Sequence, residues 1–469
     1  MIKLEKYKPN KQTQKIIYVM TCILLVAFGA IFLYKSYALY EEKKDFNVIN
    51  GQVEEPGDLY FAYYVNGTIS KDVPTKDSGL TLDTTKSSCN SGVTVSWDDD
   101  NWHAILDYST YTANSTTRTK CTLYFTKKKE LLNNYIRNLV KDANSSSNDV
   151  YTVPNKTSDS CTYTLAYDGT SDNNLRYVGS NPCNYVKIDN EIWRIIGVMN
   201  NIDDGTGKKE TRIKLIRNES IGKYSWDSSE SSVNSGWGVN EWSQADLMKL
   251  LNPGYESESV GGSLYYNNSS GNCYFDENNA TKACDFTSSG LKTNLKNLVG
   301  NTLWHTGSND GVTYTEDNIV TSKFYELERS SNNGKICKLD DYCNDTVTRT
   351  TTWTGKVGLM YPSDYGYATG GGSTSNRTSC LAIELYNWGD AGDCKNNDWL
   401  YNSNAWQQTI SPSAHSWYAS YVFGVDANGA VEDGSAYPYC FIRPSVYLKS
   451  NVLILSGEGT LENPYEIAD

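Results

Sequence analysis

The feature that most constrains this chain is one uncharged apolar run of nineteen residues, 16–34, near its N-terminus. A helix of that length spans roughly 28 Å, close to the hydrocarbon thickness of a bilayer. Five lysines and one glutamate precede the run. Because basic flanks stay in the cytoplasm, the pattern predicts a cytoplasmic tail over 1–15, a transmembrane signal-anchor over 16–38 and an exported remainder.

A cleaved signal peptide is the alternative for the same segment. Ser36 and Ala38 form the small-x-small pattern of a cleavage site. Lys35 would then lie inside the recognition window, and the run is long for a signal peptide, so an uncleaved anchor is the preferred interpretation. We therefore expect a single-pass protein of the cell membrane, with a cytoplasmic N-terminus and extracellular C-terminal domains.

The exported part is acidic. Residues 1–44 contain eight basic and three acidic residues, which leaves 34 basic and 52 acidic residues, a balance of −18, in the rest of the chain. Such a surface repels nucleic acid and anionic lipid, so the expected contact with the membrane is made by the N-terminal helix alone.

The cysteines indicate an oxidising compartment. Cys22 lies within the apolar run, and ten of the other eleven cysteines are spaced as neighbours that would close short loops. Short disulfide loops are typical of exported proteins, although spacing does not prove connectivity. The expected pairs are Cys89–Cys121, Cys161–Cys183, Cys273–Cys284, Cys337–Cys343 and Cys380–Cys394.

Cys440 is left without a neighbour, either as a buried thiol, which is the preferred interpretation, or as a reactive one. A zinc site is a poor alternative because the chain has no CxxC pair and three histidines. We expect neither a metal nor a cofactor.

Hydrophobic periodicity divides the exported part into two regions. Over 46–127, alternating apolar residues separated by Gly, Asn, Asp and Ser clusters predict a small antiparallel β-sandwich. Residues 128–148 are predicted to be an amphipathic helix followed by an Asn/Ser linker. Residues 149–469 then mix strands, helices and long loops.

Several elements of the second region can be placed. Strands are expected at 185–188 and 191–198 around a tight turn at Asp189 and Asn190, and at 213–216. Helices are expected at 243–251 and 291–299. A strand over 357–361, a hairpin over 422–431 and a closing strand over 441–448, interrupted near Pro444, follow.

This order of elements resembles the C-type-lectin-like fold, in particular its bacterial branch with formylglycine-generating-enzyme-like surface domains. Segments 360–364 (MYPSD), 406–413, 422–431 and 442–448 (IRPSVYL) resemble signature elements of that branch. Segments 166–178, 193–194 and 457–465 resemble membrane-anchored surface proteins of gut Firmicutes. The resemblance implies a place in the cell rather than a reaction.

The expected fold class is therefore α+β: an N-terminal transmembrane helix, a small antiparallel β-sandwich, and a C-type-lectin-like α+β domain over 149–469. Formylglycine-generating enzymes use a cysteine pair at a metal-binding site, whereas Cys440 stands alone in the matching region. The sequence also contains no GxSxG, HExxH or Walker motif. We therefore assign no catalytic residue.

The tryptophans suggest a binding surface. Trp388, Trp399, Trp406 and Trp417 fall within thirty residues, in the region that carries the ligand surface of lectin-like folds. Flat aromatic faces can pack on sugars or anchor a protein interface. Alternatively, these side chains hold together a region with few aliphatic residues.

Three functions remain open. The first is a binding or adhesion protein for a glycan or a surface protein, which uses the four tryptophans. The second is a structural surface-layer or filament component. The third is an oxidase-type enzyme on the lectin-like fold.

Overall fold

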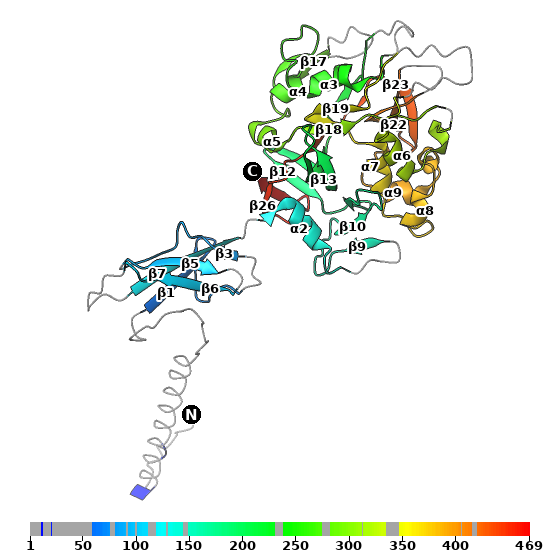
Figure 1. Cartoon of the computed structure of the whole chain (residues 1–469). Helices are drawn as coiled ribbons and strands as arrows, with labels where there is room; N and C mark the ends of the chain where they lie inside the picture. Colours follow the sequence, from blue (N-terminus) through cyan, green and yellow to red (C-terminus); the bar gives the residue numbers. More distant parts are fainter. Residues whose placement is uncertain are drawn as a thin grey trace, which may run out of the picture. The chain divides into compact units, whose positions relative to one another are not determined.

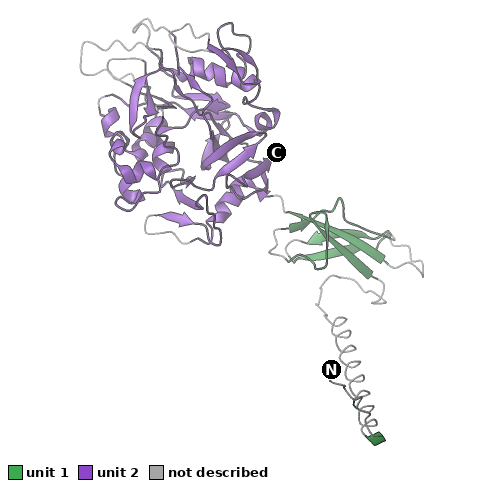
Figure 2. Cartoon of the chain, turned by 180° about the vertical axis from the view of Figure 1, so that it is seen from behind, with its two compact units in different colours: residues 1–128 green, residues 129–469 purple. Residues whose placement is uncertain are grey.

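The structure is a computed structural model of the chain. It describes residues 11–12, 20, 59–75, 80–90, 92–98, 101–110, 119–127, 130–143, 149–229, 238–273, 282–311, 313–333, 347–404, 406–414 and 420–469. The chain divides into two compact units, residues 1–128 (unit 1) and 129–469 (unit 2), which Figures 1 and 2 show.

Unit 1 consists of short strands. Its described strands are β1 (Leu59–Val65), β2 (Thr68–Ser70), β3 (Leu80–Leu82), β4 (Ser88–Cys89), β5 (Thr94–Asp98), β6 (His103–Asp107) and β7 (Thr119–Lys127). One sheet has the order β2-β1-β7-β3, with β4 also paired to β7, and β5 and β6 form a separate hairpin. Trp97 of this hairpin packs edge-on against Phe125 of β7, at 5.1 Å between ring centres, which joins the two layers.

The expected purely antiparallel sandwich is wrong for unit 1, because its central strands β1 and β7 are parallel. Leu59 pairs with Thr119 and Val65 with Phe125 in that register. Parallel neighbours require a crossover connection, and here β2 to β6 occupy the intervening chain. The alternation of apolar residues is the same for either strand direction, so the pattern could not reveal it.

Unit 2 contains two larger sheets. Their strands and those of two small two-stranded sheets are β8 (Glu130–Leu131), β9 (Val150–Thr152), β10 (Thr164–Tyr167), β11 (Leu175–Tyr177), β12 (Tyr185–Ile188), β13 (Glu191–Asp203), β14 (Lys209–Arg217), β15 (Lys223–Tyr224), β16 (Ser270–Cys273), β17 (Lys282–Asp285), β18 (Thr302–His305), β19 (Thr352–Gly355), β20 (Val357–Gly358), β21 (Gln407–Pro412), β22 (Tyr421–Val425), β23 (Val431–Ser435), β24 (Cys440–Phe441), β25 (Ser445–Tyr447), β26 (Leu453–Ser456) and β27 (Tyr465–Ala468).

The helices of unit 2 are short. They are α2 (Leu132–Leu139), α3 (Asp246–Leu251), α4 (Leu264–Asn267), α5 (Thr293–Leu298), α6 (Thr321–Glu328), α7 (Pro362–Tyr367), α8 (Arg377–Leu381) and α9 (Gly392–Asn396), with 3₁₀ turns η2 (Trp242–Gln244), η3 (Glu316–Asn318) and η4 (Leu385–Gly389).

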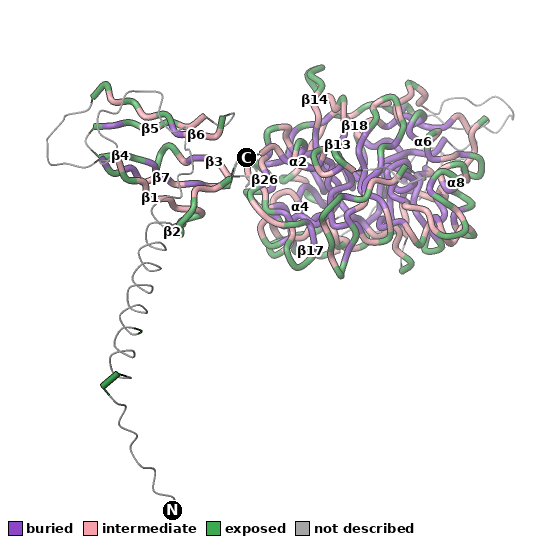
Figure 3. Tube along the Cα trace, turned by 90° about the horizontal axis from the view of Figure 1, so that it is seen from below, coloured by how far each residue is buried: buried purple, intermediate pink, exposed green. Residues whose placement is uncertain are grey.

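The larger sheet has the order β20-β25-β14-β13-β12-β27-β26-β8, and β11, β10 and β9 extend from β13. Its centre is the long hairpin β13–β14, which is mostly buried (Figure 3). The last strand, β27, runs parallel to β12, and β26 pairs with β8 at the start of the unit. The two ends of unit 2 therefore meet in one sheet (Figure 1).

The turn between β12 and β13 is as expected from the sequence. Asp189 has φ 55°, a left-handed conformation that aspartate and asparagine tolerate better than most residues. The expected closing strand over 441–448, with its expected interruption near Pro444, is divided into β24 and β25. Pro444 lies between them and has no backbone N–H to donate to a ladder.

Helix α2, which lies within the range 128–148 of the predicted helix and linker, belongs to unit 2. Helix α2 is shorter than expected, and Leu132 and Ile136 are fully buried in the core of unit 2. Its apolar face therefore packs on the sheet and is part of the unit.

The expected fold class must also be corrected. Strands make up 37% and helices 17% of the structure, so strands dominate an architecture of several sheets. The segment predicted to cross a membrane, 16–38, lies outside the described residues except for Met20. Within the described ranges, no helix is long and apolar enough to span a bilayer.

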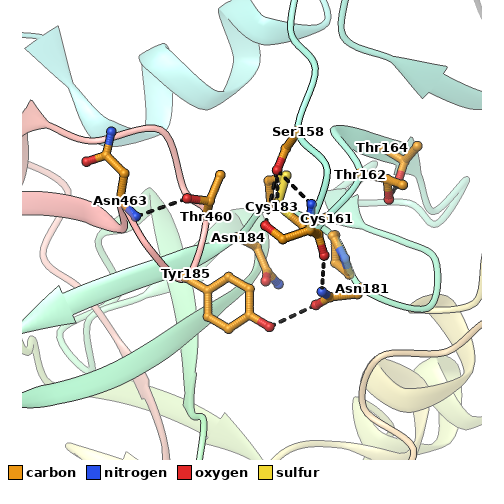
Figure 4. Close-up of a disulfide and its surroundings, with 12 residues drawn as sticks. Ser158, Cys161, Thr162, Thr164, Asn181, Cys183, Asn184, Tyr185, Thr460 and Asn463 are labelled. Carbon is orange, nitrogen blue, oxygen red and sulfur yellow. Dashed lines mark hydrogen bonds between the residues drawn. A yellow bond between two sulfur atoms is a disulfide. The ribbon is translucent and has the colours of Figure 1, made fainter.

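Four disulfides are present among the described residues, and they join four of the expected pairs: Cys89–Cys121, Cys161–Cys183, Cys273–Cys284 and Cys380–Cys394. Cys337 and Cys343 lie outside the described residues. Figure 4 shows the second bond near Asn181, whose side chain donates to the Ser160 carbonyl and accepts from the Tyr185 hydroxyl, each at 2.8 Å. The bond therefore lies in a segment that is also fixed by hydrogen bonds.

Candidate functional site

A buried carboxylate, Asp364, is the centre of a charged cluster in unit 2. It lies in the first turn of α7, where Oδ2 accepts the Tyr361 backbone N–H at 2.9 Å and caps the helix. Its Oδ1 accepts Nη1 of Arg176 at 2.7 Å, and Oδ2 also accepts the ammonium of Lys214. All three charged side chains are at most 2% exposed, so their pairing offsets the loss of hydration.

The cluster fixes the ionisation of Asp364. Burial alone would raise the pKa of this carboxyl, but the charges of Lys214 and Arg176 lower it to about 2. Aromatic rings enclose the lysine, whose Nζ lies 4.1 Å from the centre of the Tyr361 ring. Asp364 is therefore ionised at neutral pH inside the core.

A hydrogen-bonded path runs from this cluster to the surface. Nε of Arg176 donates to Asp168 at 2.9 Å, and Asn174 Nδ2 donates to the same carboxylate at 2.8 Å. The same Nδ2 is 3.3 Å from the hydroxyl of Tyr325, which in turn donates to Asp172. Asp172 lines a surface cleft, so the position of this carboxylate is set by the core.

This cleft, which we call the Asp172 cleft, has a volume of about 320 Å³ and an almost entirely polar lining. Its lining residues are Asp172, Asn200, Asn201, Lys209, Glu210 and Thr211.

A β-bulge in β13 forms one wall of the Asp172 cleft. The pairing register shifts between Met199 and Ile202, and Asn201 has φ 56°. Bulges redirect side chains, and here Asn201 Nδ2 donates to Asp172 Oδ1 at 2.9 Å while Asn200 Nδ2 donates to the Asp172 carbonyl at 2.9 Å. Both amides hold the acidic residue in place.

Strand β14 supplies the charges on the other wall. Glu210 accepts Nη2 of Arg212 at 3.0 Å, and it also pairs with Lys208. The exposed ammonium of Lys209 has no hydrogen bond or ion pair with any described residue. The cleft therefore combines two fixed carboxylates with one cation that is free to bind a ligand.

A second connection to the core runs through the end of α6. The Arg329 guanidinium lies 3.4 Å from the centre of the Tyr325 ring, and its Nε is 4.0 Å from Asp172. Its Nη1 is 3.1 Å from Glu328, which accepts the Ser363 backbone N–H at 2.9 Å. Burial raises the pKa of Glu328 to about 7, although Arg329 and Ser363 favour its charged form.

His305, at the end of β18, is close enough to Arg329 and Asp172 for their charges to change its pKa. Burial, and then the charge of Arg329, lower its pKa to about 4, against a weaker opposite effect of Asp172. The imidazole is therefore neutral at physiological pH and adds no positive charge to the cluster.

Two of the four predicted tryptophans, Trp388 and Trp399, are buried and do not form a surface. Trp388 is fully buried against Tyr365, and Trp399 is 5% exposed, with its indole N–H donating to the Tyr177 carbonyl at 2.9 Å. Trp406 is partly buried, and Trp417 lies outside the described residues. For Trp388 and Trp399 the alternative interpretation holds, because these rings fill the core of a loop-rich region.

Cys440 is a free thiol beside Gln408, and burial raises its pKa to about 11. A thiol in that state is a weak nucleophile at neutral pH. His415, its nearest histidine in the sequence, lies outside the described residues. Within the described part of the chain, no group of three or more His, Cys, Asp or Glu residues is placed to hold a metal ion.

Comparison with known proteins does not extend these observations. No family model, no curated protein and no solved structure matches this chain. These comparisons therefore do not test the resemblance to C-type-lectin-like surface proteins. The function proposed below rests on the geometry of the site.

The sequence analysis did not identify Asp364, Lys214, Arg176 or Asp172. Lys214 had a detectable signal, because it interrupts the apolar strand 213–216 at a position between Ile213 and Leu215. A cation inside a buried strand needs a partner. Nothing in the sequence says that this partner is Asp364, 150 residues away.

Replacing Asp364 by alanine is expected to destabilise unit 2 by about 3–5 kcal/mol, because Lys214 is left as a buried cation without its carboxylate and Arg176 keeps only Asp168 of its two carboxylate partners. Denaturant unfolding measures the change. Asp469→Asn is the control, since its pair with Lys449 is more than 40% exposed and should contribute less than about 1 kcal/mol. Equal effects of the two substitutions would contradict the assigned role of Asp364.

The raised pKa of Glu328 gives a pH dependence with a defined sign. Its stabilising effect is complete below the ordinary carboxyl pKa and is lost as pH rises to about 7. Between pH 4.5 and 7, the stability of the wild type should therefore fall by about 3 kcal/mol relative to Glu328→Gln. Glu326→Gln, on the exposed side of α6, is the control, and its stability should change with pH as that of the wild type does. If the stability of Glu328→Gln also changed with pH as that of the wild type does, the raised pKa of Glu328 would be excluded.

Proposed function

We propose that this chain is an exported binding protein that takes a small polar ligand in the Asp172 cleft of unit 2. The observation that carries the proposal is the continuous hydrogen-bonded path from buried Asp364 to Asp172 at the surface. A carboxylate held in this way needs no ordering when a ligand arrives, which reduces the entropic cost of binding.

The lining of the Asp172 cleft indicates the chemistry of the ligand. Asp172 and Glu210 are acceptors for an ammonium or hydroxyl group, and the free ammonium of Lys209 can bind a carboxylate. Asn200 and Asn201 are largely committed to holding Asp172. A small ligand that carries both a cationic and an anionic group fits this set.

Export is supported by the four disulfides in the described residues, which are distributed over both units. Stable disulfides of this kind are rare in the cytosol, where thiols are kept reduced. The acidic surface agrees with a role away from nucleic acid.

Export predicts the redox state of the cysteines in the native cell. Cells are quenched with a maleimide of high mass, and the chain is analysed by gel mobility before and after reduction. The eight cysteines of the four described disulfides should react only after reduction. If the chain were found in the cytosolic fraction and all eight thiols reacted before reduction, the proposed location would be wrong.

Ligand binding is tested by thermal unfolding of the full chain with free amino acids, dipeptides and amino sugars. A ligand at 100 times its Kd should stabilise the chain by about 2.7 kcal/mol. Asp172→Asn and Lys209→Met should each abolish the gain. Asp107→Asn, in an exposed turn of unit 1, is the matched control and should retain it. A gain that survives both cleft substitutions, or no gain with any compound, would refute the binding site.

A further inference from the structure

A second and larger cleft lies elsewhere in unit 2, where three segments meet. It has a volume of about 510 Å³, within the usual range for small-ligand sites. We call it the Asp189 cleft, and its lining residues are Asp189, Asn190, Asn267, Asn268, Leu291, Lys292, Thr293, Asn294 and Lys296. They come from the β12–β13 turn, the end of α4, and the start of α5 with the two residues that precede it.

Hydrogen bonds between side chains fix the three segments relative to one another. Asp189 Oδ1 accepts Asn294 Nδ2 at 2.6 Å, which ties the turn to α5. Lys292 donates to Asn268 Oδ1 and, at 2.5 Å, to the Thr287 carbonyl, which ties the end of α4 to the same segment. The walls of the cleft are therefore formed before a ligand binds.

The lining also has unused hydrogen-bonding capacity. The ammonium of Lys296 lies 5.0 Å from the centre of the Tyr266 ring and has no hydrogen bond or ion pair with any described residue. Asn190 and Thr293 are exposed. Asp189 Oδ2 is buried and has no partner in the described part of the chain, and a ligand hydroxyl that reached it would remove the cost of that unmet acceptor.

The composition of this lining selects against most ligand classes. Leu291 is its single aliphatic residue and no aromatic ring belongs to it, so an apolar ligand gains little. Carboxamides donate and accept at once, as hydroxyl groups do, and four asparagines supply them. Lys292 and Lys296 outnumber Asp189, so the Asp189 cleft is locally cationic in a chain of net charge −13.

We propose that the Asp189 cleft binds an acidic carbohydrate, that is, a hydroxyl-rich ligand with a carboxylate or phosphate group. The ammonium groups of Lys292 and Lys296 hold the anion, and the asparagine side chains with Asp189 bind the hydroxyl groups. This site shares no residue with the Asp172 cleft. The proposal for the Asp189 cleft can therefore be tested independently of the proposal for the Asp172 cleft.

The test is calorimetric titration of the full chain at low salt with four probes: trigalacturonate, glucose 6-phosphate, maltotriose and inorganic phosphate. At least one of the two acidic sugars should bind at least tenfold more tightly than both maltotriose and inorganic phosphate. Which acidic sugar binds identifies the anion as carboxylate or phosphate. Added salt should weaken binding, because the contact is electrostatic.

Three variants locate the binding. Lys296→Met should weaken it at least tenfold, and so should Asp189→Asn, which keeps the left-handed turn and the acceptor for Asn294 but replaces one carboxylate oxygen with a donor. Lys86→Met, an exposed lysine of unit 1, removes the same charge and should change nothing.

Several results would overturn the assignment. They are the absence of binding by both acidic sugars, equal binding of maltotriose, equal binding of inorganic phosphate, or binding that both cleft variants retain. Loss of binding in Asp172→Asn with retention in Lys296→Met would move the ligand to the Asp172 cleft, and would refute this proposal while leaving the first one intact.

Discussion

The interaction on which unit 2 depends is the buried pairing of Asp364 with Arg176 and Lys214. The carboxylate lies in the first turn of α7, Arg176 belongs to β11 and Lys214 to β14. One side chain therefore joins a helix to two strands of the large sheet. Buried charges add little stability when compared with apolar side chains of the same shape, but removing one partner is strongly destabilising. We infer that the cluster selects one arrangement of these elements over others.

The sequence predicted the features that depend on near neighbours. Pairing cysteines with their neighbours gave four bonds that the structure contains, because short loops bring both partners together at low entropic cost. The turn at Asp189 was predictable for the same reason, since local backbone conformation decides it. Both features are determined within some thirty residues of chain.

Features that depend on distant contacts could not be predicted in this way. The parallel pairing of β1 with β7 leaves the apolar alternation unchanged, so the pattern could not distinguish it from an antiparallel pair. Trp388 and Trp399 were predicted to lie on a surface because they cluster in the region that carries the ligand surface of lectin-like folds, yet both are buried. Trp399 donates to the carbonyl of Tyr177, which is 222 positions earlier. The residues of the Asp172 cleft were missed for the same reason.

The two clefts lie near opposite ends of one strand. Asp189 and Asn190 form the turn that precedes β13, whereas Asn200 and Asn201 lie near the end of β13, before the tip of the β13–β14 hairpin. At about 3.3 Å per residue, some ten residues of strand separate the two sites by roughly 35 Å. A small ligand cannot occupy both, so each cleft recognises its own ligand.

The two clefts also differ in the charged residues around them, because they lie at opposite ends of β13. At the far end of β13, the Asp172 cleft contains a carboxylate whose position is fixed through Asn174 and Tyr325. At its near end, the turn is hydrogen-bonded to α5, and Lys292 and Lys296 outnumber Asp189 in the lining of the cleft. A rigid strand with a mixed-charge site at one end and a cationic site at the other can keep two recognition chemistries apart within one acidic unit.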